Sequence, residues 1–174
     1  PGNLTPFDNS HLYNGTDRGN YTENSFAGIA IGKNTNIQET GNPTYYSGLA
    51  IGNYAQATGG ISFALGHYAQ ALSPSAMALG TATKASGFNS LAMMRQAYAG
   101  AKYAAAIGTA ASAQGEASLA MGHSALAKGA QSIAIGSANP TPFEDDKHTQ
   151  YTKYDESSNT QANTARAIAI GQGA

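Results

Sequence analysis

Apolar and polar residues alternate along much of this chain with a period of two, in short segments that end in turn-forming residues. The stretch SFALGHYAQALSPS, residues 62–75, shows one such unit. Phe63 and Leu65 would point to one face of an extended strand and the residues between them to the other. GHY at 66–68 predicts a turn, and AQA at 69–71 predicts a second short strand before another bend. Each unit therefore predicts two short strands and two bends, which form one flattened coil.

The units recur at a fixed interval. The phrase aliphatic–Ala–aliphatic–Gly ends at Gly52 and then at every fourteenth residue as far as Gly136, with Met94 in place of one Gly. The steps from Gly32 to Gly52 and from Gly136 to Gly171 are 20 and 35 residues, so they hold 6 and 21 residues more than one period. A fixed period broken only by insertions is typical of stacked repeats, whose insertions leave the stack as loops.

This pattern divides the chain into two parts. We expect an N-terminal non-repeat segment over residues 1–24 and a roll over residues 25–174, with insertions near 36–43 and 139–165. The second insertion is polar and holds five of the ten acidic residues. We expect it to project as a loop or to lie across a neighbouring subunit, and to rejoin the roll near Arg166.

The recurrent glycines favour strands over helices, although alanine is the strongest helix former. The expected fold class is all-β, a parallel β-roll or solenoid of 14-residue coils. A left-handed hexapeptide helix is excluded, because its three sides need about 18 residues per coil. A calcium-binding nonapeptide roll needs a recurrent Asp, whereas the one acid between residues 47 and 137 is Glu116.

The first strand of each unit lacks charge on both faces. One face carries larger apolar side chains such as Phe63 and Leu65, and the other carries alanines. A sheet that is apolar on both faces has to be covered on both. The residues alone do not distinguish the two faces, and we assign the larger side chains to the coil interior. The alanines would then contact identical rolls; they are Ala30, Ala50, Ala64, Ala78, Ala92, Ala106, Ala120 and Ala134.

Composition narrows the class of protein. The 174 residues include no Cys and no Trp, 11% are charged, and the net charge is −1. This balance gives no reason to expect nucleic acid as a partner, and the lack of Cys excludes a disulfide framework. No apolar run approaches the roughly 20 residues of a membrane-spanning helix. Because no signal peptide precedes Pro1 and the chain stops within a repeat, we expect an excised piece of a longer, processed protein.

One motif carries a resemblance to a known family. The pattern S-x-A-[IL]-G-x-x-A-x-A-x-G is nearly whole at residues 118–129 (SLAMGHSALAKG) and again at 62–73. It resembles the head domains of trimeric autotransporter adhesins, the YadA-like heads. The resemblance implies a left-handed parallel β-roll and a homotrimer. Met94 in the Gly position and Ala105 in the first aliphatic position depart from the pattern, and Met94 brings the local bend into question.

The same resemblance implies a function and a location. Such heads are surface adhesins of Gram-negative bacteria, anchored in the outer membrane through a C-terminal region that this chain would lack. The expected partners are host extracellular matrix proteins of the fibronectin, laminin or collagen class, or cell-surface receptors. We expect no enzyme activity, no cofactor and no metal.

Candidate chemistry is sparse. His67 and His123 hold the same repeat position four coils apart, about 19 Å by strand spacing, so they cannot share a metal within one chain. Glu144–Asp146 could bind calcium, although an acidic loop is more often simply solvated. No Ser-His-Asp arrangement or phosphate loop is discernible. The alternatives left open are a β-solenoid that binds or degrades polysaccharide and an ice-binding solenoid.

An adhesin needs a broad contact surface, and stacking would place every fourteenth side chain in a column about 4.8 Å apart. One column lies at the first turn, one on the second strand and one at the second bend. At the second bend, Lys102 and Glu116 are one coil apart and are expected to pair. The candidate ligand-binding residues are the aromatic and basic members of these columns: Tyr54, Tyr68, Lys84, Phe88, Tyr98, Lys102 and Tyr103.

Overall fold

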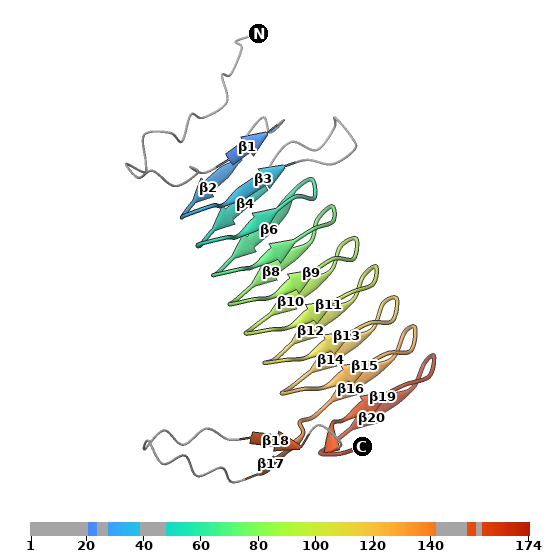
Figure 1. Ribbon diagram of the computed structural model, residues 1–174. Helices are drawn as coiled ribbons and strands as arrows, with labels where there is room; N and C mark the ends of the chain where they lie inside the picture. The colour runs from blue at the N-terminus through green and yellow to red at the C-terminus, as the bar shows by residue number, and fades with distance from the viewer. Residues whose placement is uncertain (1–20, 24–27, 39–47, 142–152, 156–157) are drawn as a thin grey trace, which may run out of the picture.

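The computed structural model describes residues 21–23, 28–38, 48–141, 153–155 and 158–174, and these residues contain no α-helix. Apart from one antiparallel pair, their strands form two parallel sheets of nine strands each. The coils stack in chain order from the N-terminal to the C-terminal end (Figure 1). The fold is therefore a parallel β-solenoid, as the sequence predicts.

The strands fall into three groups. The first-strand sheet contains β2 (Ile29–Ile31), β4 (Gly48–Ile51), β6 (Ser62–Leu65), β8 (Met77–Leu79), β10 (Leu91–Met93), β12 (Ala105–Ile107), β14 (Leu119–Met121), β16 (Ile133–Ile135) and β20 (Ile168–Ile170). The second-strand sheet contains β1 (Tyr21–Glu23), β3 (Asn36–Gln38), β5 (Gln56–Ala57), β7 (Gln70–Ala71), β9 (Lys84–Ala85), β11 (Tyr98–Ala99), β13 (Ser112–Ala113), β15 (Leu126–Ala127) and β19 (Gln161–Ala162). A separate antiparallel pair is formed by β17 (Asn139–Thr141) and β18 (Lys153–Asp155).

The strand register reproduces the sequence period. Ala78 pairs with Ala92 and Tyr98 with Ser112, an offset of 14 residues in both sheets. Parallel strands in this register place equivalent side chains of successive coils side by side. The columns predicted from the sequence are therefore present.

The interior of the coil is filled by alanine, which overturns the assignment of the two faces. Ala64, Ala78 and Ala106 have no exposed surface, whereas Phe63 and Leu65 point outward. The inner positions of the second strand are also alanines from β5 onward, such as Ala71, whereas β3 has the buried Ile37 beside Gly48. Because the turns that join the strands are so short, the two sheets lie close together and the space between them holds mainly methyl-sized side chains. The larger apolar residues of the first strand lie outside.

The first turn depends on an unusual backbone conformation. Gly66 has φ of +134°, and Tyr68, two residues on, has φ of +56°. Glycine adopts positive φ without steric cost, which explains its recurrence at this position. Met94 replaces this glycine in one coil and still adopts φ of +80°, and its N–H donates to the Leu79 carbonyl as the glycines do in other coils. The departure at Met94 therefore does not break the turn.

Glycine has another role at the second bend. A side chain at Gly87 would collide with the backbone carbonyl of Ala101 in the next coil, and one at Gly115 would collide with that of Gly129. Close stacking of the coils, rather than positive φ, requires glycine here. The buried hydroxyl of Ser90 donates to the Gly87 carbonyl at 2.6 Å and so closes the bend.

The register locates the insertions more closely than the sequence did. β2 pairs with β4 and β3 with β5 at the same offset of 20 residues, so the first insertion follows β3 and falls on residues 39–47, outside the described residues. The roll also begins before residue 25, because β1 pairs with β3. In the second insertion, β17 and β18 form a hairpin, and the N–H of Leu126 donates to the Thr160 carbonyl. The roll therefore resumes at Thr160 and not near Arg166.

A small increase in side-chain size should destabilise the roll at an inward position of the coil and not at an outward one. We expect Ala106→Val to lower the free energy of unfolding by about 1–3 kcal/mol, because the interior has no room for two more methyl groups. Ser112→Val, on the outward side of the second strand of the same coil, is the control and should change it by less than about 0.5 kcal/mol. Denaturant titrations at one protein concentration give both values, and equal effects would refute the closed alanine interior.

Removing the second insertion should leave the roll intact. We expect deletion of residues 139–159, which joins Ala138 to Thr160, to preserve the unfolding midpoint, because it restores the 14-residue spacing to β19 and β20. Circular dichroism during denaturant unfolding would test this. Loss of the β signal would instead show that the insertion is needed for folding.

Candidate functional site

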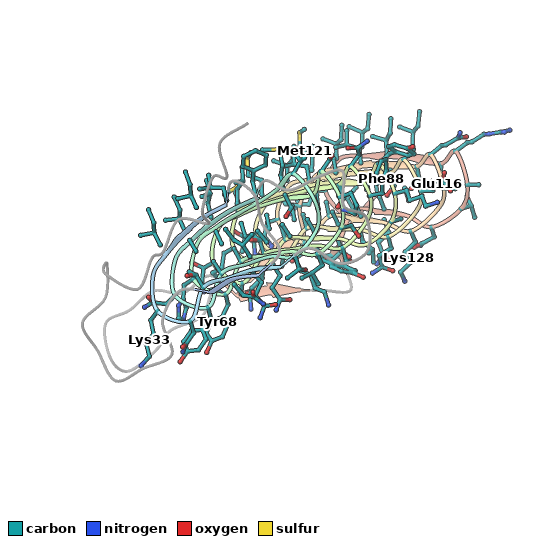
Figure 2. All side chains as sticks on the ribbon, turned by 90° about the horizontal axis from the view of Figure 1, so that it is seen from above. Lys33, Tyr68, Phe88, Glu116, Met121 and Lys128 are labelled. Atoms are coloured by element: carbon teal, nitrogen blue, oxygen red, sulfur yellow. The ribbon has the colours of Figure 1, made fainter. Side chains whose placement is uncertain are left out.

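The outside of the roll presents two broad faces and two narrow edges. The outward side chains of the first-strand sheet form an aliphatic face, and those of the second-strand sheet form a polar face. The first turns make one edge, here named the first-turn edge, and the second bends make the second-bend edge. In Figure 2, Met121 lies on the aliphatic face, Lys33 and Tyr68 lie at the first-turn edge, and Phe88 and Glu116 lie toward the second-bend edge. Each surface is a column or row of equivalent repeat positions.

The aliphatic face runs the full length of the first-strand sheet. Ile29 is 56% exposed, Met77 38% and Ile170 67% in the single chain. Soluble monomers rarely expose apolar patches above a few hundred Å², so a continuous apolar face of this length indicates an interaction surface. Its members are Ile29, Ile31, Leu49, Ile51, Phe63, Leu65, Met77, Leu79, Leu91, Met93, Ala105, Ile107, Leu119, Met121, Ile133, Ile135, Ile168 and Ile170.

The first-turn edge carries an aromatic cluster near its N-terminal end. The rings of Tyr54 and Tyr68 stack in parallel, with centroids 4.7 Å apart and an interplanar angle of 5°. His67 packs its ring edge-on against both, at 6.2 Å from Tyr54 and 4.4 Å from Tyr68. The sequence indicated the tyrosine column and the repeat position of His67, but His67 was not among the candidate ligand-binding residues.

Farther along the same edge lie Arg95 and His123. They repeat the position of His67 at intervals of 28 residues; the position shared by the two histidines was recognised in the sequence, whereas Arg95 between them was not. Burial lowers the pKa of His123 below its usual value and Arg95 adds to this, while a backbone hydrogen bond opposes it. His123 Nδ1 lies 3.0 Å from the hydroxyl oxygen of Ser124. This turn therefore favours the neutral imidazole.

The second-bend edge carries the other aromatic pair. Phe88 and Tyr103 contact each other edge-to-face across adjacent coils, with ring centroids 5.9 Å apart and an interplanar angle of 89°. Lys102 and Glu116 also lie in adjacent coils, since the N–H of Ala117 donates to the Lys102 carbonyl. In the described part of the chain, however, their side chains form no ion pair, so that expectation was wrong.

Beyond Tyr103, this edge becomes hollow. Three alanines replace larger side chains there and leave an open groove of about 420 Å³. Arg166 Nε donates to Gln131 Oε1 at 3.3 Å at one end of the groove, and Glu116 lies at the other. The lining residues are Glu116, Ala117, Ala130, Gln131, Ala165 and Arg166.

The polar face is built from amides, hydroxyls and a few larger side chains. Gln70 Nε2 donates to Gln56 Oε1 at 3.5 Å, which continues the strand ladder between side chains. Lys84 and Tyr98 are direct neighbours in adjacent strands, and Lys84 is exposed. The Tyr98 ring lies over Gly100, where a Cβ atom would come within 2.6 Å of the tyrosine oxygen. Tyr98 therefore leans from the polar face toward the second-bend edge.

The seven candidate residues do not form one patch. Tyr54 and Tyr68 lie at the first-turn edge, the opposite end of the flattened coil from Phe88 (Figure 2). The others lie on the polar face or along the second-bend edge: Lys84, Phe88, Tyr98, Lys102 and Tyr103. Sequence columns predict neighbours along the roll but not which columns share a face.

Metal and membrane features are few in the part of the chain described. No three His, Cys, Asp or Glu side chains among those residues gather as metal ligands would. Glu144–Asp146, the acidic candidate for calcium, lies outside the described residues. Within the described ranges, no helix is long and apolar enough to cross a membrane.

The fold and these surfaces define a parallel β-solenoid of 14-residue coils with one aliphatic and one polar outer face. The family model for the YadA head domain repeat (2 copies) matches residues 46–69, 71–93, 99–125, 113–139 and 158–174. These segments cover more than half of the chain, which therefore belongs to the YadA head domain family. This confirms the resemblance carried by the repeat motif. No curated protein matches the chain in sequence.

Proposed function

We propose that this chain is the head of a trimeric autotransporter adhesin, displayed on the bacterial surface and anchored in the outer membrane through a C-terminal region outside this chain. It acts by binding and not by catalysis, and its partners are host matrix proteins of the fibronectin, laminin or collagen class or cell-surface receptors. The observation that supports this most is the YadA head repeat, which covers more than half of the chain.

The aliphatic face supports assembly into a homotrimer. Three rolls lie side by side with parallel axes, and their aliphatic faces meet around a common axis. Such packing removes the exposed part of Leu79, Ile107 and their equivalents from water, and each contributes less than the about 1.5–3 kcal/mol of a fully exposed side chain, because both are already half-buried in the single chain. This assigns subunit contact to the larger apolar residues, which is the reverse of the assignment made from the sequence.

The polar face then remains for the host ligand. In this arrangement it points away from the trimer axis in every copy, so three identical surfaces surround the rod. Lys84 and Tyr98 combine a mobile cation with an aromatic side chain on an otherwise amide- and hydroxyl-rich surface, and Lys102 lies beyond them on the second-bend edge. Aromatic residues carry much of the energy of protein interfaces, so this pair is the proposed adhesive centre.

Charge placed on the aliphatic face should prevent assembly. We expect Leu79→Asp with Ile107→Asp to give a monomer or an unfolded chain, because the carboxylates would be buried without partners. The matched control, Gln70→Asp with Ser112→Asp on the polar face, should remain a trimer. Sedimentation equilibrium measures the mass of each, and a trimer of the first variant would exclude this face as the contact.

Attachment should depend on the proposed adhesive centre. We expect Lys84→Ala with Tyr98→Ala to weaken binding of the trimer to its matrix ligand at least about fivefold, as loss of an interface anchor does. Ser112→Ala with Gln114→Ala, on the same face, is the control and should bind normally. Surface plasmon resonance on a panel of immobilised fibronectin, laminin and collagen gives the comparison. Normal binding by the first variant would move the adhesive centre elsewhere.

A further inference from the structure

The two edges of the roll are opposite ends of one flattened coil, and a closed assembly brings unlike edges together. In a ring of three copies related by rotation about a common axis, side-to-side contacts are heterologous, so each surface meets a different one on the next copy. With the aliphatic faces toward the axis, the first-turn edge of one copy meets the second-bend edge of the next. This step rests on the proposed trimer.

Because the three copies are related by rotation without translation along the axis, equivalent residues of all copies lie at the same height along the roll. The first turn and the second bend of a coil are separated by about half of the 14-residue period, as Tyr68 and Ser75 show. A first-turn residue therefore lies midway in height between two second bends of the neighbour. Tyr68 falls between Ile61 and Ser75, and Ala82 falls between Ser75 and Asn89.

At these levels, the aromatic residues of each edge face mostly small or apolar residues on the other. The stacked Tyr54 and Tyr68 lie at the height of second bends 59–61 and 73–75, which present glycine and serine together with the 39% exposed side chain of Ile61. In the next coils the relation reverses, because Phe88 lies between Thr81 and Arg95, and Tyr103 lies between Gln96 and Ala110. The small residues Thr81, Ala82, Thr109 and Ala110 thus flank this aromatic pair on both sides, with Arg95 and Gln96 between them.

Two further first-turn residues have aromatic or polar neighbours across the two edges. Arg95 falls between Phe88 and Lys102, so its guanidinium can lie against the Phe88 ring and away from the second cation. His123 falls between Glu116 and Ala130, which is the level of the open groove on the second-bend edge. The groove of one copy therefore faces the first turn that carries His123 on the next copy. The imidazole of His123 lies close to the level of Glu116, whose carboxylate lines the groove.

We propose that the two edges are the halves of one intersubunit seam, with the Tyr54–His67–Tyr68 cluster of one copy packed on second bends 59–61 and 73–75 of the next. Phe88 and Tyr103 pack in the opposite direction on first turns 80–82 and 108–110. Tyr68, Phe88 and Tyr103, which are 48%, 40% and 53% exposed in the single chain, become buried. Four of the seven candidate ligand residues, those with aromatic rings on the edges, then serve assembly and not adhesion.

Disulfide trapping tests the seam without background, because the chain has no cysteine. Ala82→Cys and Ser75→Cys place one thiol on each edge at adjoining levels. Within one chain they lie at opposite ends of the coil, farther apart than the roughly 7 Å limit between Cα atoms in a disulfide. We expect oxidation of the double variant to give a covalent closed trimer on non-reducing gels, and each single variant to stay monomeric on the same gels.

A second double variant controls for register. Ala82→Cys with Gln131→Cys uses the same two edges but separates the thiols by about 17 Å along the roll, given about 4.8 Å per coil, and should not be trapped. Covalent dimers from a single variant would show that like edges meet and would overturn the seam. A sedimenting trimer that the first double variant fails to trap would also overturn it and leave the proposed function standing. A monomer in sedimentation would overturn both.

Discussion

The close spacing of the two sheets is the constraint on which this molecule depends. Each coil has two strands of two to four residues joined by tight turns, and the core between them is alanine apart from Ile37 near the N-terminal end. The same spacing brings each second bend against the next coil, which leaves no room for a side chain at Gly87. An interior of methyl groups buries little apolar surface, so a single roll has little from which to derive its stability. In the proposed trimer, the aliphatic residues outside the coil supply the rest by contact with other copies.

This arrangement separates two tasks that most globular domains combine in one core. The alanine interior determines the shape and rise of the coil, and in the proposed trimer the exposed aliphatic face stabilises the assembly. The polar face takes no part in either, so its residues can vary between coils, as the series Gln70, Lys84, Tyr98 illustrates. In the proposed adhesin, recognition of a ligand can therefore change on this face without altering the fold.

The sequence predicted the repeat, the strands and the columns, because each depends on local alternation and on a fixed spacing. It failed on which face lies inside. Alternation shows that Phe63 and Ala64 point in opposite directions, but burial depends on the distance between the sheets, which is set by turns and by alanines such as Ala71 on the other strand.

The candidate site was predicted column by column and not as a surface, because Tyr68 and Phe88 belong to opposite ends of a coil whose width no local pattern gives. The insertion ends were misplaced since Thr160 occupies a position held by alanine in most other coils.

The parallel register has a mechanical consequence. The backbone hydrogen bonds that join one coil to the next run along the roll axis in both sheets and at both bends. A pull along that axis loads all the bonds between two coils at once, in parallel, and no strand can peel away alone while its neighbours hold. A sideways pull at one edge would instead load these bonds one after another. The rod is therefore anisotropic, resisting tension along its length better than prying at its edges.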